Sequence, residues 1–160
     1  MNDAEFIVSE LTKRGESIGV AESITGGRLS GALIDIAGAS NIFAGGIVAY
    51  SNLLKISDLN VSPDLLDEFG AVSIEVAQAM ALGAKNKFAA TWGLSTTGVA
   101  GPGPHNGRPA GTVWIGIAGP GVLTAINPVI SSELSRNQVR SESVAGALMA
   151  FARILNPTKI

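Results

Sequence analysis

Short apolar runs alternate with segments of helical periodicity along this chain, and no other feature of the sequence constrains the fold as strongly. The runs at residues 17–22, 45–51 and 92–98 have the length and apolar character of buried strands. The nearly continuous apolar character of residues 45–51 favours a strand that is covered on both faces. Strands that alternate with helices in this way form a largely parallel sheet between helical layers.

The helices are predicted from apolar residues that recur every three to four positions and from capping residues at the helix ends. Glycine closes helices because it readily adopts the left-handed conformation, and Ser-Pro-Asp is typical of a helix start. The predicted helices are an opening helix that ends at Gly15, residues 28–38, a helix that begins at Ser62, a helix from Ser73 to Phe88, and residues 135–155.

The last two predicted strands form an antiparallel hairpin. Residues 112–119 and 122–130 are separated only by Pro120 and Gly121, which favour a tight turn. Pro128 indicates an edge strand, because proline has no N–H to donate to a neighbouring strand. We therefore predict an α/β fold: a three-layer α/β/α sandwich with a mostly parallel, mixed sheet, built as a single domain over residues 1–160.

The composition excludes several classes of protein. Apolar residues make up 46% of the chain and charged residues 15%, which excludes a disordered protein. A net charge of −2 without a run of basic residues argues against nucleic-acid binding. No apolar run reaches the about 18–20 residues of a membrane span, and the N-terminus lacks the pattern of a signal peptide. We therefore expect a cytoplasmic protein that does not bind membranes.

Cysteine is absent and histidine occurs once, which limits the chemistry available to a catalytic site. The chain can form no disulfide, thiolate nucleophile or cysteine-ligated metal site. His105 lies in a glycine- and proline-rich loop, where a lone histidine is most often a solvated side chain. No pair of histidines is available for a metal. We expect no metal and no cofactor.

Polar and glycine-rich segments follow three of the predicted strands. Ser23 follows the first strand, Tyr50 and Ser51 end the second, and residues 96–103 (TTGVAGPG) follow the third. Ligands of such sheets bind beyond the carboxyl ends of the strands. The sequence therefore predicts that these segments meet at one rim.

The segment ESITGG (residues 22–27) joins the first strand to the next helix and has two interpretations. In the first, Ser23 or Thr25 caps the helix and Gly26 and Gly27 permit a tight turn. In the second, free N–H groups at the helix start bind a phosphate or a developing oxyanion.

Three basic residues are candidates for the same rim. Lys55 lies one helical turn beyond Ser51, and is either a solvated lysine or a buried neutral base for a serine nucleophile. Arg136 and Arg140 share one face at the start of the last helix, where cations oppose the helix dipole. They are either a surface pair or the partners of an anion.

The chain resembles the CinA C-terminal domain family, which includes stand-alone nicotinamide mononucleotide deamidases. The resemblance covers about residues 3–155 and rests on motifs that occur in the family's order: AESITGG, AGAS, YSNLLK, GAVS, TTGVAGP with RPAGTV, and RNQVR. It implies an α/β/α sandwich and a metal-free serine–lysine amidase. It also implies a role in pyridine nucleotide salvage.

The family's site residues carry over by motif. The resemblance implies that Ser23 is the nucleophile, that Lys55 is its base and that Tyr50 is an active-site tyrosine. It further assigns Ser40 of AGAS, Thr97 and Arg136 to the substrate site. We expect further substrate contacts from a set of neighbouring residues: Thr25, Gly26, Gly27, Gly98 and Arg140.

The chain departs from the family pattern at four places. Ile24 replaces the usual cysteine after the nucleophile, and Arg108 replaces a lysine in a shortened loop without a glycine pair. Leu134 replaces a glycine that normally precedes the RNQVR motif. The serine and lysine of the implied dyad are both retained.

The predicted function is hydrolysis of the carboxamide of nicotinamide mononucleotide to nicotinic acid mononucleotide and ammonia. Neutral Lys55 would take the proton of Ser23, and backbone N–H groups of residues 25–27 or of Gly98 would hold the oxyanion. The alternatives are a non-catalytic nucleotide-binding module linked to competence or DNA damage, and an amidase of another small amide. We expect a small nucleotide as the partner, and a homo-oligomer.

Overall fold

The computed structural model describes residues 1–156 and contains one sheet of five strands with helices on both sides. The strands are β1 (Ile18–Glu22), β2 (Phe43–Val48), β3 (Trp92–Gly98), β4 (Val113–Gly119) and β5 (Val122–Ile126). The helices are α1 (Asp3–Arg14), α2 (Arg28–Ile34), α3 (Asn52–Leu59), α4 (Pro63–Phe69), α5 (Ile74–Lys87) and α6 (Arg136–Leu155), with a 3₁₀ turn at Ala39–Asn41.

The strand order in the sheet is β2-β1-β3-β4-β5. Strand β1 pairs in parallel with both β2 and β3, whereas β4 is antiparallel to β3 and to β5. Only β4 therefore opposes the common direction, which confirms the mostly parallel, mixed sheet. Strand β5 lies at an edge, as predicted, although Pro128 follows the strand and is not part of it.

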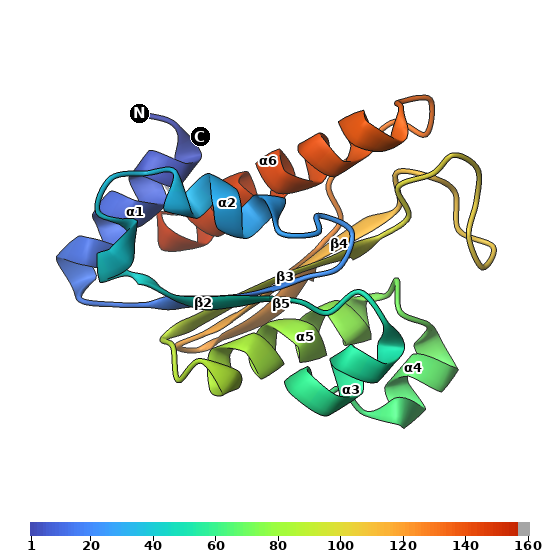
Figure 1. Cartoon of the computed structure of the whole chain (residues 1–160), viewed down its shortest axis with the longest axis horizontal. Coiled ribbons are helices and arrows are strands. Elements are labelled where there is room, and N and C mark those ends of the chain that lie inside the picture. Colours follow the sequence, from blue (N-terminus) through green and yellow to red (C-terminus); the bar gives the residue numbers. More distant parts are fainter. Residues whose placement is uncertain (157–160) are drawn as a thin grey trace.

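Helices α1, α2 and α6 cover one face of the sheet, and α3, α4 and α5 cover the other (Figure 1). The first layer encloses a large core to which α1, α6 and the sheet all contribute, for example through Ile7, Leu94 and Phe151. The second layer encloses a smaller core around Leu59, Val76 and Met80. The predicted three-layer sandwich is therefore correct.

Helix α5 packs unusually close to the sheet, because two strand residues that face it have no side chain. A Cβ atom at Gly93 or Gly116 would overlap the backbone of α5. The hydroxyl of Ser95 donates to the carbonyl of Ala77 at 2.6 Å and ties the helix to β3. This packing fixes the layer that carries α3 and its lysine.

The prediction differs from the structure at several elements: it contained no helix at Asn52–Leu59, and its last strand ran to residue 130 instead of ending at Ile126. The helix predicted over residues 28–38 ends at Ile34, and Gly38 instead precedes the 3₁₀ turn with a left-handed φ of 88°. Strand β2 is not covered on both faces: it is an edge strand whose residues alternate between half-buried and exposed. The strand lacks polar residues partly because it contains two glycines. Gly45 and Gly46 leave room for the side chains of Phe88 and Ser30, which pack against the strand.

The carboxyl ends of β1, β2 and β3 meet at one rim of the sheet, because these strands are parallel neighbours. The segment after β1 enters α2, the segment after β2 enters α3, and the long loop 99–112 follows β3. The N-terminus of α6 reaches the same region (Figure 1). Within residues 1–156, no helix has the length and apolar character needed to cross a membrane.

Candidate active site

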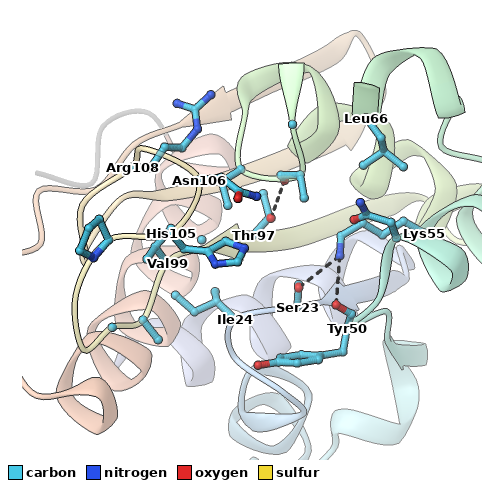
Figure 2. Close-up of a pocket in the computed structure, with 18 of the residues that line it drawn as sticks. Ser23, Ile24, Tyr50, Lys55, Leu66, Thr97, Val99, His105, Asn106 and Arg108 are labelled. Carbon is cyan, nitrogen blue, oxygen red and sulfur yellow. Dashed lines mark hydrogen bonds between the residues drawn. The ribbon is translucent and has the colours of Figure 1, made fainter. Parts of the chain in front are cut away.

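A cavity of about 730 Å³ lies at this rim. Its walls come from the turn after β1, the start of α3, loop 99–112 and the N-terminus of α6 (Figures 1 and 2). Six of the residues predicted for the site line it: Ser23, Tyr50, Lys55, Thr97, Gly98 and Arg136. Segments that are far apart in the sequence thus contribute to one concave surface.

Ser23 and Lys55 face each other in this cavity (Figure 2). The Nζ atom of Lys55 lies 3.3 Å from the Oγ atom of Ser23. It lies 2.9 Å from the carbonyl oxygen of Ala49 and 3.5 Å from that of Tyr50. A neutral amine has two N–H donors and one lone pair, so these two carbonyls can accept both N–H groups while the lone pair faces Ser23.

Lys55 is buried, with only 2% of its surface exposed. None of the ion pairs among residues 1–156 includes it. Burial disfavours the charged ammonium form and lowers the pKa of Lys55 from 10.5 to about 8. A lysine with this pKa is partly neutral near physiological pH, as a general base requires.

Glu22 organises the turn that carries Ser23, and the sequence analysis did not identify it. The side chain is fully buried at the end of β1. Its carboxylate accepts hydrogen bonds from the backbone N–H groups of Gly27, Leu29 and Ser30 and from the hydroxyls of Thr25 and Ser30. Glu22 therefore occupies the N-terminus of α2, and that helix end is not open to a phosphate.

This arrangement corrects the roles expected for Thr25, Gly26 and Gly27. Thr25 is fully buried, and its hydroxyl contacts Glu22 and Thr96 rather than the cavity. The N–H of Gly27 donates to Glu22. Gly26 and Gly27 both adopt left-handed conformations and do not line the cavity. These three residues shape the turn.

Arg136 and Tyr50 lie at the mouth of the cavity. Arg136 donates to the carbonyl of Gly101 at 2.6 Å and to the hydroxyl of Tyr50 at 3.4 Å. Both side chains are exposed, and Arg136 has no carboxylate partner among the ion pairs of residues 1–156. The guanidinium is thus available to an anion that enters from solvent.

Arg140 lies one turn further along α6 and has a different environment. Its Nε atom donates to the carbonyl of Ile24 at 2.9 Å, and one terminal nitrogen donates to the carbonyl of Thr25 at 3.0 Å. It does not line the cavity. The expectation that Arg140 contacts substrate is therefore not supported, although it shares a helix face with Arg136.

Thr97 and Gly98 form part of the cavity wall below loop 99–112. The hydroxyl of Thr97 donates to the carbonyl of Ala71 at 2.7 Å, which fixes the segment before α5 (Figure 2). A Cβ atom at Gly98 would come within 2.8 Å of the carbonyl of Thr112. Gly98 therefore lets β3 and β4 stay paired next to the cavity.

The expectation that Ser40 lies with the other site residues is wrong within one chain. Ser40 is exposed in the 3₁₀ turn that precedes β2. Phe43, where β2 begins, pairs with Ile18 at the opposite end of the sheet from Ser23. Ser40 precedes β2 in the chain and therefore lies at the amino end of that strand, whereas the cavity lies at the carboxyl ends.

Loop 99–112 adds two side chains that were not among the residues predicted for the site. His105 and Arg108 line the cavity, and Arg108 donates to the carbonyl of Phe69 at 3.2 Å (Figure 2). His105 remains exposed. In the part of the chain that the structure describes, no three His, Cys, Asp or Glu side chains are grouped so that they could hold a metal ion.

The sequence and the fold both match known proteins. The model of the CinA C-terminal domain matches residues 2–155. A CinA-like protein of Prochlorococcus marinus subsp. pastoris is 45% identical over 156 residues, which cover 96% of this chain and 36% of that protein. A CinA-like protein of Frankia casuarinae is 44% identical over 93% of this chain and 34% of its own length. The chain thus spans about a third of the length of these curated relatives.

Solved structures agree with this relationship. The competence/damage inducible protein CihA of Agrobacterium tumefaciens superposes with a TM-score of 0.89 at 33% identity, over 96% of this chain and 93% of that one. A competence-damaged protein (CinA) superfamily protein of Escherichia coli has a TM-score of 0.90 at 29% identity, over 95% of this chain and 88% of that one. The chain belongs to the CinA C-terminal domain family.

Proposed function

We propose that this protein is an amidase that hydrolyses the carboxamide of nicotinamide mononucleotide by a serine–lysine mechanism. The observation that carries the proposal is the contact of 3.3 Å between Ser23 and a buried lysine whose pKa is lowered to about 8. The substrate follows from the resemblance to the family's deamidases and from the exposed arginine at the mouth of the cavity.

In the first half of the reaction, Lys55 takes the proton of Ser23 while Oγ attacks the carboxamide carbon. The C–N bond then breaks, and the proton passes from Lys55 to the leaving nitrogen, so that ammonia departs. In the second half, Lys55 takes a proton from water, which attacks the ester carbon. The bond to Oγ breaks, Ser23 recovers its proton, and nicotinic acid mononucleotide leaves.

The oxyanion that forms on the carboxamide oxygen needs hydrogen-bond donors close to Ser23. Within residues 1–156, the backbone N–H groups of Ile24 and Thr25 have no hydrogen-bond partner. Ile24 also lines the cavity beside Ser23 (Figure 2). We assign the oxyanion to the N–H of Ile24, because Thr25 does not line the cavity and the N–H of Gly27 is bound by Glu22.

Arg136 is the proposed ligand of the 5′-phosphate. Its guanidinium can form two parallel hydrogen bonds to phosphate oxygens, which a lysine cannot. The N-terminus of α6 also favours an anion at this position. The ring of Tyr50 lies next to Arg136 and offers an apolar surface to the nucleotide.

Ammonia release from nicotinamide mononucleotide tests the proposal. Wild-type protein should release stoichiometric ammonia, and Ser23→Ala should release none, because the nucleophile is absent. Ser9→Ala, an exposed serine on α1, is the matched control and should keep full activity. A protein that binds the nucleotide without releasing ammonia would be a binding module, and activity confined to other amides would identify a different substrate.

A further inference from the structure

Arg140 binds the backbone of the two residues that follow the nucleophile. Its hydrogen bonds of 2.9 and 3.0 Å end on the carbonyl oxygens of Ile24 and Thr25. Gly26 makes this contact possible, because a Cβ atom there would lie 2.7 Å from a terminal nitrogen of Arg140. The guanidinium thus fits against the backbone of the turn itself.

These hydrogen bonds fix more than the two carbonyls. In a trans peptide unit the C=O and the following N–H point in opposite directions. Arg140 therefore holds the N–H of Thr25 facing away from α6, because the same peptide unit presents the carbonyl of Ile24 to the guanidinium. The two hydrogen bonds thus fix the peptide units on both sides of Thr25, directly after Ile24, whose own N–H is the proposed oxyanion donor.

Glu22 holds the other end of the same turn with the opposite polarity. Its buried carboxylate accepts from the N–H of Gly27 at 3.0 Å and from the hydroxyl of Thr25 at 2.6 Å. Arg140 binds carbonyls and Glu22 binds donors, so residues 24–27 are restrained from two sides. Fixed donors stabilise a developing oxyanion most, because they need no reorganisation during the reaction.

We propose that Arg140 is a positioning residue of the amidase, which holds the carbonyls of this turn and thereby fixes the Ile24 segment that carries the oxyanion donor. The inference rests on the proposed function. It separates the two arginines of the RNQVR motif: Arg136 binds the substrate's phosphate from the cavity, and Arg140 acts on the enzyme's own backbone.

The kinetics of Arg140→Ala should distinguish positioning from phosphate binding. A displacement of about 1 Å at a reacting centre can lower a rate about 100-fold, so we expect kcat to fall about 10- to 100-fold while KM changes less than about 3-fold. The factor should be the same for nicotinamide mononucleotide and for nicotinamide riboside, which lacks the phosphate. Arg136→Ala should instead slow only the hydrolysis of nicotinamide mononucleotide, because only that substrate carries the phosphate. Arg140→Lys keeps the charge but has a single nitrogen, which cannot reproduce both hydrogen bonds of the guanidinium, so it should have an intermediate kcat.

Arg28→Ala is the matched control for a structural role. Arg28 also joins α2 to α6, through Asn137 and Ser141, but it does not touch residues 24 and 25. It should leave kcat within about 3-fold of wild type, since an exposed contact of this kind contributes little. The inference is overturned if folded Arg140→Lys has wild-type kcat and Arg140→Ala loses thermal stability alone. It is also overturned if Arg140→Ala impairs only the phosphorylated substrate.

Labelling of Ser23 by phenylmethylsulfonyl fluoride separates this inference from the proposed function. The reagent forms an Oγ–S bond at an activated serine as fluoride leaves, and peptide mass spectrometry locates it without any nucleotide. Labelling without turnover of nicotinamide mononucleotide would refute the substrate only, and Arg140→Ala should then slow labelling about 10- to 100-fold. If wild-type protein shows neither turnover nor labelling, both proposals fail.

Discussion

At the scale of single residues, Lys55 shows most clearly how the fold creates chemistry. In the sequence YSNLLK the two leucines are the apolar residues, yet Leu53 is 72% exposed and Lys55 is 2% exposed. The start of α3 thus turns its lysine inward, against Ser23 and the carbonyl of Ala49. A lysine in this position is neutral at a much lower pH than a solvated one.

The pH dependence of kcat/KM should report this effect. Below the pKa of Lys55 the amine is protonated and cannot accept the proton of Ser23, so activity should rise about tenfold per pH unit and level off above about pH 8. Steady-state rates between pH 5.5 and 9.5 measure it, and Lys55→Arg should be inactive throughout. A profile that still rises at pH 9.5 would indicate a lysine with an ordinary pKa, and a flat profile would exclude Lys55 as the base.

At the scale of elements, the junction between β1 and α2 depends on a buried carboxylate. Glu22 accepts hydrogen bonds from three N–H groups and two hydroxyls at the start of α2. In Glu22→Gln one acceptor oxygen becomes an amide NH₂ group, which faces other donors. Hydrogen bonds to charged groups contribute about 1.5–3 kcal/mol each, so the free energy of unfolding should fall by about 2–3 kcal/mol.

Urea denaturation measures this loss, and α1 supplies the control. Glu5 caps α1 from an exposed position, where its carboxylate accepts from the N–H of Asn2. Glutamine serves equally in such a capping box, so Glu5→Gln should cost less than about 0.5 kcal/mol. Equal losses in the two variants would show that the buried position of Glu22 adds nothing to stability.

Turn and capping residues allowed several elements to be predicted from the sequence, whereas the role of Glu22 at this junction could not be predicted. Local signals located β3, the hairpin, Gly15 and the Ser135 cap of α6, because turn and capping residues act within a few positions. Glu22 was missed because a lone glutamate after a strand has no distinctive spacing. Its role depends on donors from α2 that converge only in the folded chain.

At the scale of the whole molecule, the cavity is assembled by the order of strands. The parallel neighbours β1, β2 and β3 bring Ser23, Tyr50 and Thr97 to one rim, and α6 adds Arg136. Convergence at this rim was predictable from strand direction. The distant position of Ser40 was predictable in the same way, because Ser40 precedes β2 and so lies at the amino end of that strand. The separation of Arg136 from Arg140 was not, since both lie on one helix face. Such differences depend on tertiary contacts that spacing does not encode.

The mass of the peptide that contains Ser23, measured after acid quench during a single turnover, tests the central claim most directly. With the enzyme in excess over nicotinamide mononucleotide, the serine–lysine mechanism predicts a peptide heavier by the acyl group of nicotinic acid mononucleotide. The adduct should disappear as product forms and should be absent in Ser23→Ala. Two results would contradict the mechanism. One is ammonia release with the Ser23 peptide unmodified and the adduct on another residue, and the other is ammonia release by Ser23→Ala at the wild-type rate.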